Sequence, residues 1–342
     1  MLERRELIRT MGAGLLAGAA FPPLAALGQP KRPLTPGRAI CSAPGLSYAA
    51  LYIAKRRGMW DANGVDYKLT LTQGGPLALA ALNAGEADFA CLTSSDALIS
   101  WDKGIKILTV AAFTTGMAMQ MAARNDWMSK VAITPSSPVS ERIKALKQAR
   151  IGVATIGGGP AQYMKYLGSL NGIEEHELKL LAVGLGAARI AALRENQVDV
   201  IVGSAPDADE VALQGFGDFY LSFATEIPEF KNFPYTTLAV LPEFAERQPA
   251  AVTAIGKTVG EANDFLQTNF AEAVDLLRAE FPKIDGRAIQ RSMERDRSTF
   301  PRGCRMTASM WENAIKAAKS MRVVKTAPTA AEGELWTNKF LA

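Results

Sequence analysis

Two stretches of the chain repeat one order of apolar and amphipathic segments. Short apolar or alternating runs, typical of β-strands, occur in the first stretch at 39–43, 65–72 and 87–93, and in the second at 150–155, 178–183 and 198–204. Segments with helical spacing separate these runs, at 47–60, 76–85, 160–172 and 186–196. Strands that alternate with helices in this way predict parallel sheets with right-handed crossovers. The predicted fold class is therefore α/β, with one sheet for each stretch.

The same two stretches also match residue by residue. Residues 39–96 lie over residues 150–207 at a constant offset of 111, without gaps. The residues that recur include Ala80, Leu82, Asp88 and Asp96, whose counterparts are Ala191, Leu193, Asp199 and Asp207. Agreement in both element order and residue identity predicts two lobes of similar construction.

The segments outside the repeats predict how the lobes are joined. Strands are expected at 105–113 and 117–123 between the repeats and at 232–242 after them, a surface loop at 130–140, and helices at 141–148, 250–281 and 306–321. The chain therefore leaves lobe one, builds lobe two and returns, so that two crossing strands form a hinge. The expected division is lobe one at 38–120, lobe two at 121–234, and a return to lobe one with C-terminal helices at 235–342.

The first 28 residues predict an export signal. Arg4 and Arg5 precede a short Gly/Ala-rich apolar stretch, and small residues precede an expected cleavage after Gly28. Adjacent arginines before a weakly apolar stretch resemble a twin-arginine (Tat) signal. The alternative, an amphipathic helix of the mature fold, is disfavoured because five prolines interrupt residues 22–36. Residues 29–37 are expected to be a linker, and the protein is expected in the periplasm.

Composition and charge argue against several classes of partner. Of the 342 residues, 48% are apolar and 21% charged, with a net charge of +4, and this balance indicates no nucleic-acid or membrane-surface footprint. The protein is expected to be a monomer with a small-molecule ligand and no cofactor. Three cysteines (Cys41, Cys91, Cys304) are too few for a disulfide framework, and whether Cys41 and Cys91 are bridged is left open. The single histidine, His176, cannot form a histidine metal site or a catalytic histidine pair by itself.

The expected ligand site lies between the lobes. In open α/β sheets ligands bind beyond the carboxyl ends of the strands, and two facing lobes define one cleft there. The candidate ligand-binding residues follow strand ends or link the crossing strands: Ser47, Tyr48, Thr93, Ser94, Ser95, Thr114, Thr115, Gly157, Gly158, Gly159, Ser204, Asp207 and Tyr235. Tyr48 and Tyr235 offer rings that could stack on a planar ligand, although tyrosines near strand ends often serve packing alone.

Three segments resemble one family. Residues 43–69, 74–98 and 146–173 are similar to units of the type II periplasmic binding proteins, in the branch that binds aliphatic sulfonates, taurine, nitrate or thiamine-pyrimidine precursors for ABC importers. The resemblance covers about Ala39 to Val240 and implies a two-lobed binding protein that delivers its ligand to a membrane permease. The sequence departs from the family at Gly157–Gly159, where a Gly-Ser is usual, and near Ser204, where an aromatic residue is frequent. Both departures fall on cleft positions, so the resemblance leaves the ligand open.

The three glycines have two interpretations. A tight strand-to-helix turn explains Pro160 and one glycine, whereas three glycines in a row favour a close approach to an anionic or acceptor group at a helix N-terminus. A positive φ at Gly158 is one reason for a glycine there. Neither nucleotide pattern fits: the chain has no phosphate-loop motif, and Arg189 replaces the third glycine of a dinucleotide fingerprint at 184–189.

The acidic residues Asp207, Asp209 and Glu210 also have two interpretations. They fit the first turn of a helix, where carboxylates complement the helix dipole, and Asp207 could instead bind an amine or amidine of the ligand. Two other functions stay in view: an enzyme on the same fold, as in thiamine-pyrimidine or menaquinone-precursor synthesis, and a ligand sensor for a membrane receptor. The expected function is nevertheless binding, without catalysis.

Overall fold

The computed structural model describes residues 34–341. The predicted signal peptide at 1–28 lies outside the described residues. Strand β1 (Thr35–Cys41) begins inside the stretch predicted as a linker, and its first residues pair in register with Val65–Tyr67. Pro36 and Gly37 are weak strand formers, which is why the sequence pattern did not include them. Gly37 packs closely: a Cβ there would lie 2.3 Å from Val65 Cγ1.

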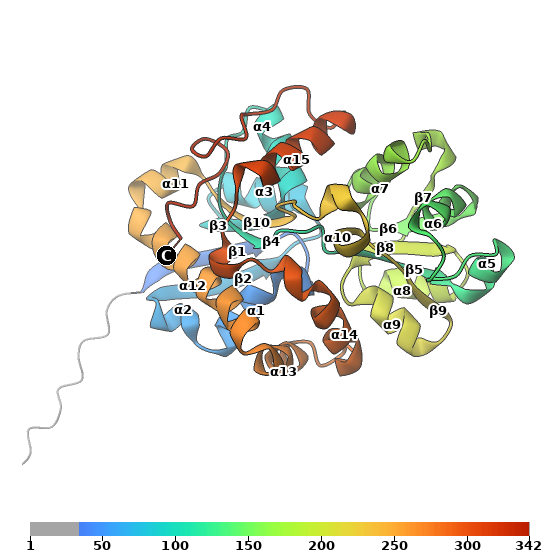
Figure 1. Cartoon of the computed structure of the whole chain (residues 1–342). Coiled ribbons are helices and arrows are strands. Elements are labelled where there is room, and N and C mark those ends of the chain that lie inside the picture. The colour runs from blue at the N-terminus through green and yellow to red at the C-terminus, as the bar shows by residue number, and fades with distance from the viewer. Residues whose placement is uncertain (1–33, 342) are drawn as a thin grey trace, which may run out of the picture. The chain divides into compact units, whose positions relative to one another are not determined.

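Two five-stranded sheets form the two lobes (Figure 1). The first has the order β2-β1-β3-β10-β4, with β2 (Val65–Leu71), β3 (Phe89–Thr93), β4 (Leu108–Thr114) and β10 (Thr236–Val240). The second has the order β7-β6-β8-β5-β9, with β5 (Met119–Arg124), β6 (Arg150–Val153), β7 (Lys179–Ala182), β8 (Val200–Ser204) and β9 (Gly217–Ser222). The predicted α/β fold and the parallel β1–β2–β3 and β6–β7–β8 units are confirmed.

Each sheet is mixed, because one strand runs against its neighbours. β10 is antiparallel to β3 and β4, and β5 is antiparallel to β8 and β9. These are the two strands that enter a lobe directly after the chain has crossed from the other one. The crossings are residues 115–118 and 223–235. The boundary predicted at 120/121 falls inside β5, and the one predicted at 234/235 lies just before β10.

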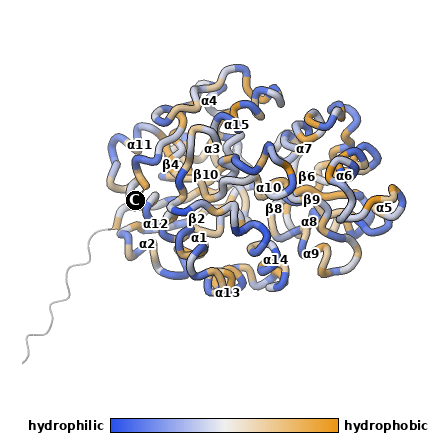
Figure 2. Tube along the Cα trace, in the orientation of Figure 1, coloured by the Kyte–Doolittle hydropathy of each residue, from blue (hydrophilic) through white to orange (hydrophobic). Residues whose placement is uncertain are grey.

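Helices cover the sheets. Lobe one has α1 (Ala49–Arg56), α2 (Met59–Ala62), α3 (Gly75–Asn83), α4 (Ser94–Asp102), α11 (Pro242–Arg247), α12 (Pro249–Thr268), α13 (Phe270–Glu280), α14 (Gly286–Asp296) and α15 (Ala308–Ser320). Lobe two and the second crossing have α5 (Asn125–Lys130), α6 (Val139–Ala145), α7 (Gly159–Leu170), α8 (Ala187–Arg194), α9 (Asp207–Gln214) and α10 (Phe223–Glu226). Orange and blue alternate along many of these helices in Figure 2, as expected for helices with one buried face.

Several elements differ from the pattern-based expectation. The helix predicted at 47–60 breaks into α1 and α2 at Gly58, whose φ of 64° is left-handed. The helical stretch predicted at 250–281 is divided at Asn269, and α5, β9 and α14 were not predicted.

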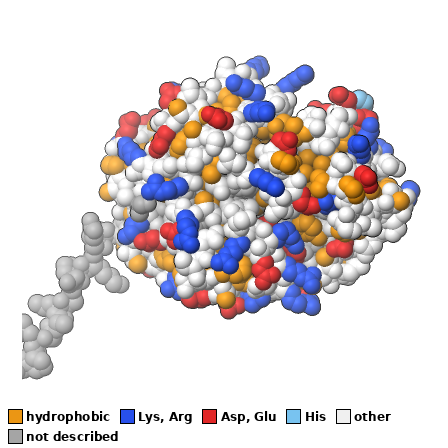
Figure 3. All heavy atoms as spheres, viewed as in Figure 1, with side chains coloured by type: hydrophobic (Ala, Val, Ile, Leu, Met, Phe, Trp, Pro, Cys, Tyr) orange, Lys and Arg blue, Asp and Glu red, His pale blue; other side chains and the backbone are white. Residues whose placement is uncertain are grey.

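Within the described residues, no helix combines the length and apolarity that a membrane crossing requires. Charged side chains of both signs are interspersed on the face shown in Figure 3.

The gapless register of the repeat is wrong by one residue at the first strand. Ala39 pairs with Phe89 in lobe one as Ile151 pairs with Val200 in lobe two, so the offset is 112 for β1 and β6 (151 − 39) but 111 for β3 and β8 (200 − 89). Arg38 and Arg150, which are also 112 apart, confirm this register, because each donates to an aspartate, Asp88 and Asp199 respectively. Lobe one therefore has one extra residue between its first two strands.

Candidate functional site

Four helical segments begin where parallel strands end. In lobe one, the 3-10 turn Leu46–Tyr48 and α4 follow β1 and β3; in lobe two, α7 and α9 follow β6 and β8. The partial positive charge of a helix N-terminus and its unpaired N–H groups are therefore available at the edge where the two sheets face each other. This is the edge at which the sequence predicts the ligand cleft.

The lobes are in contact across this cleft. A Cβ on Gly45 of lobe one would lie 3.7 Å from Ser204 Cβ of lobe two, and a Cβ on Gly159 would lie 3.8 Å from Thr93 Oγ1. Ser47, Tyr48, Asp207 and Tyr235 are all less than one tenth exposed. The structure thus has the lobes closed on each other.

The N-terminus of α4 is capped from within lobe one. Thr93 and Asp96 form a reciprocal capping box, in which Thr93 N donates to Asp96 Oδ2 (3.1 Å) and Asp96 N donates to Thr93 Oγ1 (3.2 Å). Thr93 Oγ1 also donates to Asp96 Oδ2 (2.7 Å). Burial raises the pKa of Asp96, while its hydrogen bonds from Thr93 lower it. Asp96 packs on Gly75, where a Cβ would come within 2.1 Å of its carboxylate. Asp96 therefore needs a glycine at the start of α3.

The next two residues of α4 carry hydroxyls without a partner. Ser94 Oγ and Ser95 Oγ are buried, and among residues 34–341 neither meets a partner at ordinary hydrogen-bond distance and angle. Both lie near the hydroxyl of Tyr163 on α7, whose pKa is raised chiefly by burial and lowered less by hydrogen bonding from these two serines. Leaving a buried hydroxyl unpaired costs about 1–3 kcal/mol. Two such hydroxyls at the lobe interface mark a place where an external polar group would be stabilised.

The N-terminus of α7 lies opposite these serines and has neither a side-chain cap nor an acidic residue in its first turn. Gly158 has a φ of −83° and a ψ of 167°, and none of Gly157, Gly158 and Gly159 has a positive φ, so the expectation that φ requires a glycine here is wrong. Gly158 N donates to the Thr155 carbonyl (3.3 Å), and a Cβ on Gly158 would meet Thr155 Oγ1 at 2.5 Å. The compact turn explains Gly158, whereas Gly159 is the glycine that faces lobe one.

The threonines at the hinge are engaged within the protein. Thr114 Oγ1 and Thr236 Oγ1 are hydrogen-bonded at 2.7 Å, and Thr236 Oγ1 also contacts the Ser47 carbonyl at 3.1 Å. Thr115 N donates to the Thr299 carbonyl (2.7 Å). Tyr48 is similarly engaged, because its hydroxyl is 3.0 Å from Ser42 Oγ. These residues shape the hinge side of the cleft through internal hydrogen bonds.

Asp207 is paired with Arg189, a residue absent from the predicted site. Arg189 Nε donates to Asp207 Oδ2 at 2.9 Å, and both side chains are buried. The guanidinium lies on Gly203, where a Cβ would meet Arg189 Nη2 at 2.1 Å. Beside it, burial raises the pKa of Tyr235 to about 12, against lowering effects of the Ser204 hydroxyl and the Arg189 charge. Asp209 pairs with Arg295 instead of standing free in the first turn of α9.

The predicted ligand-binding residues also lacked Asp96 and Tyr163, although Asp96 ends a loop, 93–96, that was expected to line the cleft. The recurrence of Asp96 and Asp207 in the repeat was a signal for the first of these, and Tyr163 recurs with Tyr52 at the same offset. Arg189 had only one signal in the sequence, the replacement of a glycine in the dinucleotide-like pattern.

The three cysteines are all buried and free, and Cys41 lies beside Cys91 in the β1–β3 register.

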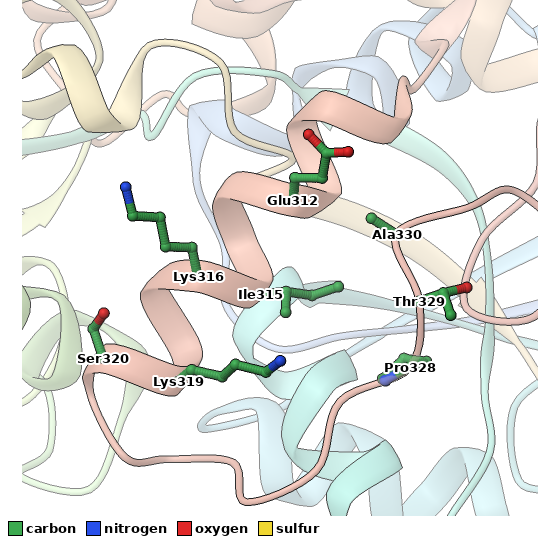
Figure 4. Close-up of a pocket in the computed structure, with 8 residues that line it drawn as sticks. All are labelled: Glu312, Ile315, Lys316, Lys319, Ser320, Pro328, Thr329 and Ala330. Atoms are coloured by element: carbon green, nitrogen blue, oxygen red, sulfur yellow. The ribbon is translucent and has the colours of Figure 1, made fainter.

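Two cavities lie elsewhere in lobe one. A groove of about 480 Å³ runs between α15 and residues 328–330 (Figure 4). Ile315 and Lys319 extend from α15 toward this segment, and Lys316 extends away from it. A smaller cavity of about 280 Å³ adjoins Glu280–Ile284.

His176 is exposed, and the described residues contain no cluster of three or more His, Cys, Asp or Glu side chains that could hold a metal ion.

Comparison with known proteins agrees with this architecture. Residues 40–278 match the NMT1-like family. YtlA of Bacillus subtilis, which is named as a binding protein, is 23% identical over 260 residues, covering 72% of this chain and 71% of its own. A solved protein from Bordetella bronchiseptica RB50 superposes with a TM-score of 0.74 at 19% identity, covering 89% of this chain and 95% of its own. The periplasmic aliphatic sulphonate binding protein SsuA of Escherichia coli superposes with a TM-score of 0.66 at 16% identity, covering 85% and 94%. The expected two-lobed periplasmic-binding-protein fold is confirmed.

Proposed function

The chain belongs to the NMT1-like family, and from this membership and the cleft we propose that it is the solute-binding component of an ABC importer. It captures a small organic or anionic molecule between its lobes and presents the closed form to a membrane permease. The observation that carries the proposal is that two lobes, joined by two crossings within residues 34–341, meet over the buried hydroxyls of Ser94 and Ser95, which no described residue pairs at ordinary hydrogen-bond geometry. Hinged closure on a ligand would supply the missing partners.

The groups around the cleft favour an acceptor-bearing ligand. Ser94 and Ser95 can each donate one hydrogen bond, and the uncapped N-terminus of α7 favours negative charge. The Arg189–Asp207 pair adds a buried cation and its counter-ion. A sulfonate, a carboxylate or a polar heteroaromatic ring would each place oxygen or nitrogen acceptors against these donors. The site residues proposed from the sequence are retained as this ligand shell, with Tyr163 and Arg189 added.

The charge of the ligand decides the role of Asp207. If an anionic group binds near Arg189, Asp207→Asn should raise the affinity, because Arg189 would lose its resident counter-ion. If an amine binds Asp207 itself, the same change should lower the affinity by about tenfold or more, since a charged hydrogen bond is lost. Because Asp207 already pairs with Arg189, we expect the first result.

A binding screen tests the function. The purified protein should be titrated calorimetrically with ethanesulfonate, nitrate, benzoate and cytosine, and its melting temperature measured with each, since a ligand that binds only the folded state raises it. The double variant Ser94→Ala, Ser95→Ala should lose about tenfold or more in affinity for the molecule that binds. The matched control is Ser136→Ala, because Ser136 lies on an exposed loop away from the cleft. Equal affinity of parent and double variant would remove these hydroxyls from the ligand site.

The alternative of an enzyme on this fold makes a different prediction for the same incubation. A binding protein returns its ligand unchanged, so mass spectrometry after prolonged incubation should find only the molecule that was added. A product formed by the purified protein would move the assignment to catalysis. A sensor for a membrane receptor would bind the same ligand but would be captured with a receptor instead of a permease.

The proposed location is the periplasm, reached by the Tat route. Its support is the Arg4–Arg5 pair before a weakly apolar stretch. Replacing both arginines by lysine should leave the precursor in the cytoplasm, as measured by cell fractionation. Normal delivery of this variant to the periplasm would exclude the Tat route.

A further inference from the structure

Helix α14 contacts both lobes. On one side, Arg278 of α13 donates to the Gly286 carbonyl (3.1 Å) and to Gln290 Oε1 (3.0 Å). On the other side, Asp209 of α9 accepts two hydrogen bonds from Arg295, 2.7 and 2.6 Å long, and one from Ser292. Figure 1 shows α14 between α13 and α9. A rotation of one lobe against the other must therefore disturb one of these two sets of contacts.

The last residue of α14 makes a second, buried contact with lobe two. Asp296 accepts a hydrogen bond at Oδ2 from Gln120 Nε2 of β5, at 3.0 Å. Asp296 is 3% exposed and Gln120 is 2% exposed. The other oxygen of each group, Asp296 Oδ1 and Gln120 Oε1, is buried without a hydrogen-bond partner in the part of the chain that the structure describes. Asp296 and Gln120 are thus hydrogen-bonded to each other, yet each has one buried oxygen that accepts no hydrogen bond from the described residues.

A single proton on Asp296 would give both of these oxygens a hydrogen-bond partner. An ionised carboxylate only accepts hydrogen bonds, whereas a protonated carboxyl also donates one. A proton on Asp296 Oδ1 supplies the donor that Gln120 Oε1 lacks, while the amide N–H continues to donate to Oδ2. We propose that Asp296 is protonated in the closed molecule and forms with Gln120 a cyclic carboxylic acid–amide pair, which fastens α14 to lobe two.

The charges around Asp296 agree with this protonation state. The pKa of Asp296 is raised to about 7, chiefly by burial and also by the Asp209 carboxylate, against the lowering effects of Arg295 and of the Gln120 hydrogen bond. The nearby cation is engaged elsewhere, because Arg295 is paired with Asp209. Glu226 of α10, whose charge also acts on Arg295, is paired with Arg142.

The pair makes the contact between α14 and lobe two sensitive to pH. A carboxyl whose pKa is raised by closure binds its proton more tightly in the closed form than when exposed, where it titrates near about pH 4. The contact is therefore strongest in acid and weakens as the pH rises from about 4 to about 7. If the chain captures a ligand by closure, as proposed above, ligand retention weakens in the same direction; this consequence alone rests on the proposed function.

Asp296→Asn tests the proton directly. An asparagine keeps the cyclic pair, with its amide N–H in place of the carboxyl O–H, and cannot titrate. We expect the melting temperature of Asp296→Asn relative to the parent to rise between pH 5 and pH 8, and to exceed that of the parent by at least about 2 °C at pH 8. Infrared difference spectra at pH 6 should show a protonated carboxyl in the parent that is missing from the variant.

Asp209→Asn is the matched control on the same interface. It breaks the ion pair with Arg295, so it should lower the melting temperature at both pH values. If Asp296→Asn is destabilised at every pH as Asp209→Asn is, or if the parent shows no protonated carboxyl that the variant lacks, Asp296 is ionised and the proposal is overturned. Neither measurement uses a ligand. A negative result here therefore does not bear on the proposed binding function, and a negative ligand screen does not bear on the protonation of Asp296.

Discussion

At the scale of single residues, the cleft combines groups that satisfy each other with groups that do not. Thr93 and Asp96 cap α4 reciprocally, and Arg189 neutralises Asp207. Ser94 and Ser95 lie in the same turn as the capping box, and no described residue gives their buried hydroxyls a partner with ordinary hydrogen-bond geometry. Buried polar groups in proteins are nearly always hydrogen-bonded, so two such hydroxyls at the boundary between the lobes favour a ligand that would bond them there. The paired ones hold the lining in place.

Gly159 allows a test of how closely the lobes must approach. A Cβ at Gly159 would be in ordinary contact with Tyr163 and Thr93, at 3.7 and 3.8 Å, so the additional methyl groups of Gly159→Val should obstruct closure. We expect the affinity for the ligand to fall by at least about tenfold, measured by calorimetry, with the lobe still folded. The control is Gly157→Val in the same turn, because a Cβ there meets nothing within 4 Å. Equal losses in both variants would point to the turn itself instead of the approach of the lobes.

At the scale of elements, a shared clasp holds the first strand of each lobe. Arg38 binds Asp88 in lobe one and Arg150 binds Asp199 in lobe two, each through the backbone N–H and the guanidinium. Each clasp ties a residue of the first strand to the aspartate that directly precedes the neighbouring parallel strand. It therefore fixes the relative position of the two strands at the end opposite the cleft loops.

The variant Asp199→Asn tests how much this clasp contributes to the free energy of unfolding. Burial alone would raise the pKa of Asp199, but the hydrogen bonds and the charge of Arg150 lower it below its ordinary value. A lowered carboxyl pKa stabilises the fold above about pH 4, and this contribution is lost as the pH falls through the folded-state pKa. Asp199→Asn should therefore cost about 1–3 kcal/mol in urea unfolding at pH 7, and less in acid.

The control for the clasp is Asp66→Asn. Asp66 pairs with Lys68 at 3.1 Å on an exposed surface, where such a pair is worth at most about 1 kcal/mol. A loss for Asp199→Asn no greater than that of Asp66→Asn, or one that is the same at pH 7 and in acid, would show that the clasp does not stabilise the strand ends.

The elements also show how far the sequence could predict the fold and the site. Local apolar patterns predicted β1–β3 and β6–β8, and the rule for strand ends then placed Ser94 and Ser95 in a cleft. The one-residue shift at Arg38 was invisible, because few identities anchor the repeat before the first loop. Gln120 and Asp296 are 176 residues apart, and no local pattern indicates that they meet. Arg189 was likewise hidden, since its role depends on the missing side chain of Gly203.

At the scale of the whole molecule, the lobes are joined by two crossings and touch across the cleft. Residues 115–118 and 223–235 are the two connections, and α14 adds a third link through side chains. If the chain captures its ligand between the lobes, as proposed, the contacts between Gly45 and Ser204 and between Gly159 and Thr93 must separate and re-form. The fold therefore predicts an exchange between open and closed forms.

A disulfide across the cleft would arrest this exchange. A Cβ on Gly45 would lie 3.7 Å from Ser204 Cβ, within the range of about 3.5–4.5 Å that a disulfide needs, and the Gly45 φ of 167° is extended backbone that any residue adopts. The double variant Gly45→Cys, Ser204→Cys should form a bond under oxidising conditions, since Cys41, Cys91 and Cys304 are buried. Oxidised in the absence of ligand, it should not bind ligand that is added later, and reduction should restore binding; oxidised with ligand bound, it should release that ligand more slowly than its reduced form. The single variants, treated alike, should bind as before. If the oxidised double variant, with its disulfide verified by mass spectrometry, exchanges ligand as fast as its reduced form, then the ligand does not enter between these lobes.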